Sequence, residues 1–149
     1  MTLTIGDKAP AFKGKNQEGK MIQLSDYKGK KLVLFFYPKD NTPGCTEEAC
    51  NLRDNYGALR KAGFEIVGIS SDDEKSHTKF IKKHTLPFDL IADTDKSIHE
   101  SYGVWGEKQM FGKKYMGTLR TTFILDENGK IEDIIHKVNT KDHTSQIIK

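Results

Sequence analysis

Two cysteines, Cys45 and Cys50, lie five positions apart directly after a continuous apolar segment. Thr42 and Pro43 match an N-cap residue followed by proline at the first helical position. Gly44 and Cys45 therefore fall in the first turn of a predicted helix, where unpaired N–H groups and the helix dipole favour a thiolate. This spacing predicts a nucleophilic thiol, and Gly44 lets another group approach the backbone closely.

A cation is needed beside this thiol, because the charges of the adjacent Glu47 and Glu48 oppose a thiolate. Arg120 is the only arginine outside the predicted cysteine-bearing helix, and we expect it to reach Cys45 across the sheet from a strand over 118–125. A guanidinium suits both a thiolate and an oxygen substrate. The alternative is that Cys45 is a small buried hydrophobe, as free cysteine often is, and Arg120 an ordinary surface residue.

The cysteine spacing also restricts any disulfide. Five helical positions amount to ~140° of rotation and ~7.5 Å of rise, whereas disulfides need Cα atoms within ~6.8 Å. In an intact helix, Cys45 and Cys50 therefore cannot bond without unwinding at least a turn. We expect a transient, catalytic disulfide coupled to local unfolding over 43–55, visible as different amide exchange in reduced and oxidised protein.

Length and composition predict one domain over residues 1–149. The 24 basic and 21 acidic residues are interleaved and leave a net charge of +3, which argues against nucleic-acid binding. The start of the chain has no signal-peptide pattern, and the longest apolar stretch, 32–37, is far short of the ~20 residues of a membrane helix. We therefore expect a cytoplasmic protein without membrane partners, whose cysteines are catalytic, metal-binding or inert rather than a structural bridge.

Strand and helix patterns alternate along the chain. The expected strands cover 10–14, 21–24, 32–37, 64–70, 86–91, 118–125 and 130–136, the first two forming an N-terminal hairpin. The expected helices cover 42–61, 72–84, 95–102 and 142–149, and 104–117 is expected to be a loop. Helices between apolar strands imply a central sheet covered on both faces, to which the terminal hairpin adds antiparallel strands. The prediction is an α/β fold with a mixed sheet.

The pattern Pro38-x-x-x-Thr42-x-x-Cys45, with the late Arg120, resembles the peroxiredoxin active-site signature. Thr-Pro-Gly-Cys-Thr followed by Cys50 is similar to the bacterioferritin comigratory protein (peroxiredoxin Q) branch. The similarity extends over nearly the whole chain. It implies a thioredoxin-like fold and reduction of hydrogen peroxide or organic hydroperoxides by a thiol.

The resemblance also implies roles for individual residues. Cys45 would be the peroxidatic cysteine that becomes a sulfenic acid, and Cys50 the resolving cysteine of an intramolecular disulfide, which thioredoxin or a similar dithiol would reduce. The supporting residues named by the resemblance are Thr42, which would bind the peroxide; Pro38, which would shield the pocket; Arg120, which would hold the thiolate; Gly44, whose N–H region would complete the cradle; and Glu48, which would orient the arginine.

Two other classes of function remain as alternatives. A thiol–disulfide oxidoreductase would normally have two residues between its cysteines rather than four, and a non-catalytic binding module would need neither Thr42 nor Arg120. Sequence spacing predicts no zinc site, and no nucleotide fingerprint predicts an organic cofactor. We expect a monomer or weak homodimer. The chain stops soon after Asp142, so the terminal helix should be short.

Overall fold

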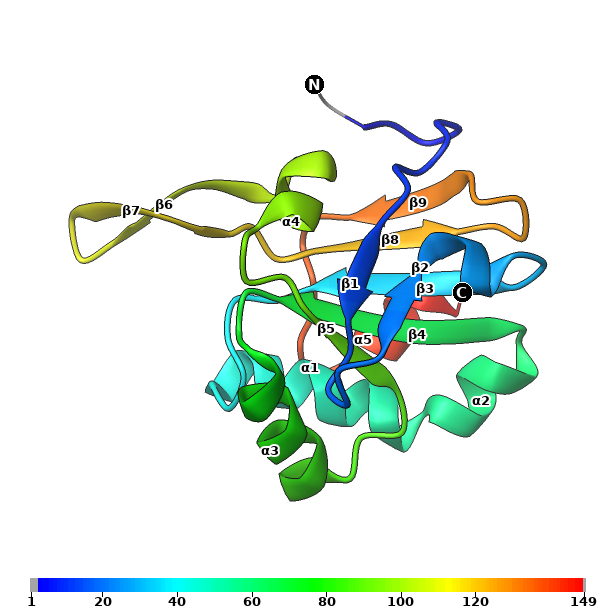
Figure 1. Cartoon of the computed structure of the whole chain (residues 1–149), viewed down its shortest axis with the longest axis horizontal. Helices are drawn as coiled ribbons and strands as arrows, with labels where there is room; N and C mark the ends of the chain where they lie inside the picture. The colour runs from blue at the N-terminus through cyan, green and yellow to red at the C-terminus, as the bar shows by residue number, and fades with distance from the viewer. Residues whose placement is uncertain (1–2, 149) are drawn as a thin grey trace.

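A five-stranded mixed sheet forms the centre of the computed structural model, which describes residues 3–148 (Figure 1). The strand order is β5 (Asp89–Ala92), β4 (Phe64–Ser70), β3 (Lys31–Phe36), β8 (Thr121–Leu125) and β9 (Ile131–Ile135). The central strand β3 is parallel to β4 and antiparallel to β8, and its last residue, Phe36, pairs with Thr121 at the start of β8. This register brings the residues just before β8 beside the segment that leaves β3.

Helices and a hairpin cover the two faces of this sheet (Figure 1). One face packs against α1 (Pro43–Asp54), α2 (Tyr56–Lys61), α3 (Glu74–His84) and α5 (His143–Ile147). The other packs against the β1 (Lys13–Lys15)–β2 (Met21–Gln23) hairpin, the 3-10 helix η1 (Leu24–Tyr27) and α4 (Ser97–Ser101). Because successive strand residues face opposite sides, Leu34 and Phe36 enter one core and Phe35 the other. The expected mixed α/β fold is confirmed.

The structure corrects the sequence prediction in two places. The expected helix over 42–61 is broken at Asn55, whose side chain donates to the Asn51 carbonyl oxygen at 2.9 Å and ends α1. The expected loop over 104–117 is instead an antiparallel hairpin of β6 (Trp105–Met110) and β7 (Lys113–Thr118). Phe111 and Gly112 both have positive φ angles, 51° and 78°, as a two-residue hairpin turn requires.

The predicted location of Arg120 within a strand is also wrong. Arg120 lies in the short connection between β7 and β8 rather than inside a strand over 118–125. The other expected elements are present with shifted or shorter bounds, including α5 near the end of the chain, whose expected last residue, Lys149, lies outside the described residues. None of the helices within residues 3–148 combines the length and apolarity needed to cross a membrane.

Candidate active site

Cys45 occupies the first turn of α1, as the sequence predicts. Thr42 is the N-cap residue and Pro43 the first helical residue, and Cys45 is only 1% exposed. The Thr42 hydroxyl does not cap the helix; it donates to the Lys39 carbonyl oxygen at 2.8 Å and closes the turn that precedes α1. The thiol therefore lies buried at a helix N-terminus, where the backbone favours negative charge.

Arg120 reaches this thiol. Its Nη2 donates to the Cys45 Sγ at 3.2 Å, while its Nη1 donates to the Glu48 Oε1 at 2.6 Å. Burial opposes the guanidinium charge, but Cys45 and Glu48 together raise the pKa of Arg120 above its ordinary value. The arginine thus remains charged and bridges two residues of α1 that lie almost one turn apart.

Glu48 is fully buried and incompletely paired. Burial raises the pKa of its carboxyl group to about 7, although the Arg120 charge acts in the opposite direction. Within residues 3–148 its Oε2 has no hydrogen-bond partner, and the Nε2 of His143 lies 3.6 Å from it. His143 does not complete the pair, because burial lowers its pKa and its Nε2 is 2.8 Å from the Thr122 hydroxyl.

The Arg120 guanidinium lies close to the backbone of Gly44. A Cβ atom at this position would lie 3.3 Å from the Arg120 Nη2, so the guanidinium occupies the space that a side chain would fill. The group that approaches the backbone here is therefore the arginine itself. Pro38 and Thr42 lie on the segment between β3 and α1, partly exposed at the entrance to the helix.

Cys50 lies farther along the same helix and is partly buried. Both cysteines are free thiols, and α1 is continuous from Pro43 to Asp54. This is the arrangement in which the two sulfur atoms point to different sides of the helix. Of the seven residues singled out from the sequence, the structure brings Gly44, Cys45, Glu48 and Arg120 into contact.

Two residues near this site were missed at the sequence level. Lys108 lies on β6, where burial and then the Arg120 charge lower its pKa while Cys45 acts in the opposite direction, so a second basic side chain faces the site from the hairpin. His143 faces Glu48 from α5. Lys108 falls in a segment that the sequence predicts to be a loop, so the direction of its side chain could not be predicted. His143 is far from both cysteines in sequence. Neither position carries a local motif that reveals its neighbours.

The comparisons with known proteins agree with this geometry. A sequence model of the AhpC/TSA family matches residues 5–134. The chain belongs to the AhpC/TSA family. The chain is 48% identical over 148 residues to a putative peroxiredoxin bcp of Coxiella burnetii, covering 99% of this chain and 98% of that relative. It is 45% identical over 149 residues to the peroxiredoxin Bcp of Bacillus subtilis, covering 100% and 95%.

A solved structure gives the same result in three dimensions. The bacterioferritin comigratory protein of Xanthomonas campestris, studied for its alkyl peroxide reduction activity, superposes with a TM-score of 0.85 at 34% identity, covering 91% of this chain and 87% of that one. The peroxiredoxin resemblance and the thioredoxin-like fold predicted from the sequence are thereby confirmed. Peroxiredoxins are peroxidases, so the AhpC/TSA chain described here is an oxidoreductase.

Proposed function

We propose that this peroxiredoxin reduces hydrogen peroxide and organic hydroperoxides with Cys45 as the attacking thiol. The observation that carries the proposal is the 3.2 Å contact between the Arg120 Nη2 and the Cys45 Sγ at the first turn of α1. A helix N-terminus and a guanidinium stabilise a thiolate by charge and hydrogen bonding, so the sulfur stays free to react. The guanidinium also offers donors to a peroxide oxygen bound beside the sulfur.

In the first step the Cys45 thiolate attacks the terminal oxygen of the hydroperoxide. An S–O bond forms and the O–O bond breaks, so the sulfur is oxidised to a sulfenic acid and the peroxide is reduced. The departing alkoxide or hydroxide takes a proton from solvent and leaves as an alcohol or as water. Arg120 favours this step because its charge stabilises the negative charge that moves from sulfur to the leaving oxygen.

In the second step the Cys50 thiol attacks the sulfur of the Cys45 sulfenic acid. The S–S bond forms as the S–O bond breaks, and the hydroxyl group leaves as water with the Cys50 proton. Because both cysteines lie on the continuous helix α1, this step requires α1 to unwind locally. A dithiol such as thioredoxin then supplies two electrons and two protons and restores both thiols.

The remaining residues of the signature shape the peroxide pocket. Thr42 has a hydroxyl whose hydrogen is used by the Lys39 carbonyl oxygen, so its oxygen lone pairs are available to accept a hydrogen bond from the peroxide. Pro38 limits water at the pocket entrance, and Glu48 holds one side of the Arg120 guanidinium. We also place the enzyme in the cytoplasm, where thiols stay reduced. We propose that it forms one domain and is a monomer or weak homodimer.

The proposal is tested by stopped-flow consumption of hydrogen peroxide by the reduced protein and its Cys45→Ser, Cys50→Ser and Arg120→Ala variants. We expect Cys45→Ser to abolish peroxide reduction. Arg120→Ala should lower the rate constant by about a hundredfold or more, as loss of a charge-stabilising donor does. Cys50→Ser should react once and fail to turn over with thioredoxin. Full activity of Cys45→Ser would contradict the proposal.

A further inference from the structure

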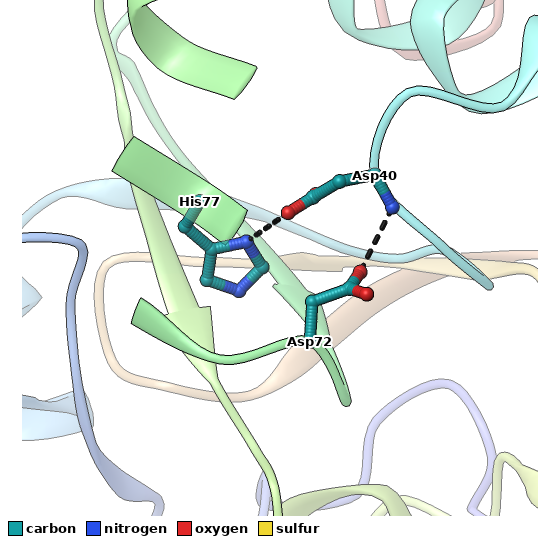
Figure 2. A group of neighbouring side chains, drawn as sticks. All are labelled: Asp40, Asp72 and His77. Atoms are coloured by element: carbon teal, nitrogen blue, oxygen red, sulfur yellow. Dashed lines mark hydrogen bonds and ion pairs between the residues drawn. The ribbon is translucent and has the colours of Figure 1, made fainter. Parts of the chain in front are cut away.

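Asp40 lies midway between Pro38 and Thr42 on the segment that connects β3 to α1, and it is almost completely buried. A carboxylate buried in a connecting segment is expensive unless its oxygens are hydrogen-bonded. Here both oxygens have partners. The Asp40 Oδ1 accepts from the Tyr37 hydroxyl at 2.7 Å, and the Oδ2 accepts from the Ser76 hydroxyl at 2.7 Å. The same Oδ2 faces the His77 Nδ1 at 2.7 Å (Figure 2).

The hydrogen bonds of His77 show why this pairing is firm. The ring is fully buried, with its Nδ1 on the Asp40 carboxylate and its Nε2 at 3.0 Å from the carbonyl oxygen of Ile91 in β5. The Asp40 carboxylate and the Ile91 carbonyl both offer acceptor oxygens, so the ring is held from two sides, by one contact from each of its nitrogens. His77 therefore links the Asp40 carboxylate to the sheet.

The backbone of Asp40 is held as well. Its N–H donates to the Asp72 Oδ2 at 2.8 Å (Figure 2). The same oxygen accepts from the Ser70 hydroxyl at the end of β4 at 2.7 Å. Burial, followed by the Asp40 charge, raises the pKa of the Tyr37 hydroxyl well above its ordinary value, so it stays a donor. Asp40 is therefore connected to β5 through His77 and to the end of β4 through Asp72.

This group also resembles a metal site, since Asp40, Asp72 and His77 bring potential ligand atoms within 4.8 Å of one another. The hydrogen bonds explain the cluster differently. Both Asp40 oxygens and both His77 nitrogens already have protein partners, and a metal would have to break the contact between Asp40 and His77 and displace two hydroxyl donors from Asp40. The cluster is complete as a hydrogen-bonded network.

We propose that Asp40 and His77 are positioning residues for peroxide reduction, which hold the Pro38–Thr42 segment in the conformation that the peroxide needs. The inference rests on the proposed function of Cys45. The rest of the segment forms a turn of its own, in which Asn41 has a φ of 62° and the Thr42 hydroxyl donates to the Lys39 carbonyl oxygen. Arg120 and the helix N-terminus hold the sulfur, and the Asp40–His77 pair holds the segment that carries Pro38 and Thr42.

These separate roles predict that breaking the Asp40–His77 pair slows peroxide reduction without changing the reactivity of the sulfur itself. When the pair is broken, Thr42 and Pro38 move, but Cys45 keeps its helix turn and its contact with Arg120. Reactions that need a bound peroxide should slow, because a misplacement of about 1 Å costs roughly a hundredfold in rate. Alkylation of the same sulfur by a small reagent needs no peroxide pocket and should change little.

The test measures two rate constants for Cys45 in full-length reduced protein that carries Cys50→Ser, so that a single thiol reacts. One is oxidation by hydrogen peroxide, and the other is alkylation by iodoacetamide. The variants are Asp40→Asn, His77→Gln and the milder Tyr37→Phe. The matched control is Thr78→Val, which removes a 2.8 Å hydrogen bond from α3 to the Gln17 carbonyl oxygen, away from the segment.

We expect Asp40→Asn and His77→Gln to lower the peroxide constant about tenfold to a hundredfold and to leave the alkylation constant nearly unchanged. Tyr37→Phe should lower the peroxide constant by a smaller factor. If the other two variants fail to fold, the result for Tyr37→Phe alone tests the inference. Unchanged peroxide constants, or a parallel fall of both constants, would overturn the inference. A wild-type protein that is alkylated but ignores peroxide would instead overturn the proposed function, and this inference with it.

Discussion

Arg120 contacts two acidic groups that compete for one positive charge. Its Nη1 binds the Glu48 Oε1 and its Nη2 binds the Cys45 Sγ. A Glu48 that holds its proton leaves the guanidinium charge to the sulfur, and the pKa of about 7 for this buried carboxyl places that balance near neutral pH. Burial of Glu48 therefore matters to the chemistry of Cys45, although the two side chains meet only through the arginine.

Gly44→Ala should slow peroxide oxidation of Cys45 severalfold. The new Cβ would lie 3.3 Å from the Arg120 Nη2, which displaces the guanidinium by a few tenths of an ångström, and catalysis is sensitive to such shifts. The measurement is stopped-flow oxidation of the reduced protein. Gly57→Ala in α2 is the control, because its Cβ would meet no atom within 4 Å while giving a similar gain of about 1 kcal/mol in helix propensity. Equal rates in both variants would contradict this explanation of Gly44.

Ionisation of the buried Glu48 carboxyl group should lower the free energy of unfolding as the pH rises. Its pKa of about 7 in the folded protein exceeds the ordinary 4.5, so the folded state holds this proton more tightly than the unfolded chain does. The resulting stabilisation is complete below about pH 4.5 and is lost as the pH rises through 7. The loss amounts to about 3 kcal/mol.

Urea unfolding at several pH values measures this effect in wild type and in Glu48→Gln. The variant cannot titrate at this position, so its unfolding free energy should fall less between pH 4.5 and 7 than that of the wild type. Subtracting the two curves cancels the contributions of all other groups. Parallel curves would mean that Glu48 is ionised throughout this range.

At the scale of elements, the proposed mechanism gives α1 two conflicting tasks. It requires α1 to be ordered so that Cys45 lies beside Arg120, and to open so that Cys50 reaches back. Contacts from α5 oppose opening, because the Asn51 Oδ1 accepts from both the N–H and the hydroxyl of Thr144 at 2.8 Å. Asn51 directly follows Cys50, so these hydrogen bonds lie where unwinding has to occur.

Thr144→Val should speed disulfide formation after Cys45 is oxidised. The change removes one buried hydrogen bond to Asn51, worth about 1 kcal/mol, which corresponds to about fivefold in the population of the opened helix. Amide exchange over 43–55 and the rate of the second kinetic phase measure the effect. Ser145→Ala is the control in the same helix, since its hydroxyl bonds only to the exposed Asp142. If opening and resolution were as slow as in wild type, α5 would not restrain α1.

The strand, turn and helix around Cys45 were predictable because each is encoded locally. The apolar run gives β3, and Thr42-Pro43 gives the start of α1. The contact with Arg120 was expected from chemistry, but its geometry depends on the pairing of Phe36 with Thr121, which no local pattern specifies. The Asp40–His77 pair depends in the same way on the packing of α3 against β5, so its members looked unrelated in the sequence.

On the scale of the whole molecule, the β6–β7 hairpin projects beyond the sheet (Figure 1). The exposed large hydrophobic side chains of the described residues are concentrated on and next to this hairpin: Met110, Phe111, Tyr115, Met116 and Leu119. Phe111, at the tip, is 97% exposed and has a φ of 51°, which is costly for a bulky residue. This hairpin is the part of the surface most prone to self-association.

Phe111→Asn should stabilise the hairpin and keep the protein monomeric at high concentration. Asn-Gly suits a turn with two positive φ angles, so we expect a gain of about 1 kcal/mol, or about 2–4 °C in Tm. Calorimetry and sedimentation velocity provide the measurements. Phe111→Gln is the control: it removes the apolar ring but, being neither glycine nor asparagine, retains the strained turn, so it should affect association alone. A lower Tm for the Asn variant would contradict the turn assignment.

The most direct test of the account is the position of the first oxidation product. Reduced Cys50→Ser protein is treated with one equivalent of hydrogen peroxide, the sulfenic acid is trapped chemically, and the modified peptide is identified by mass spectrometry. We predict that the trapped sulfenic acid lies on Cys45 and forms at a rate that falls by about a hundredfold in Arg120→Ala. A protein that loses peroxide with Cys45 unmodified, or that is oxidised at another side chain, would contradict the assignment of Cys45 as the peroxidatic thiol.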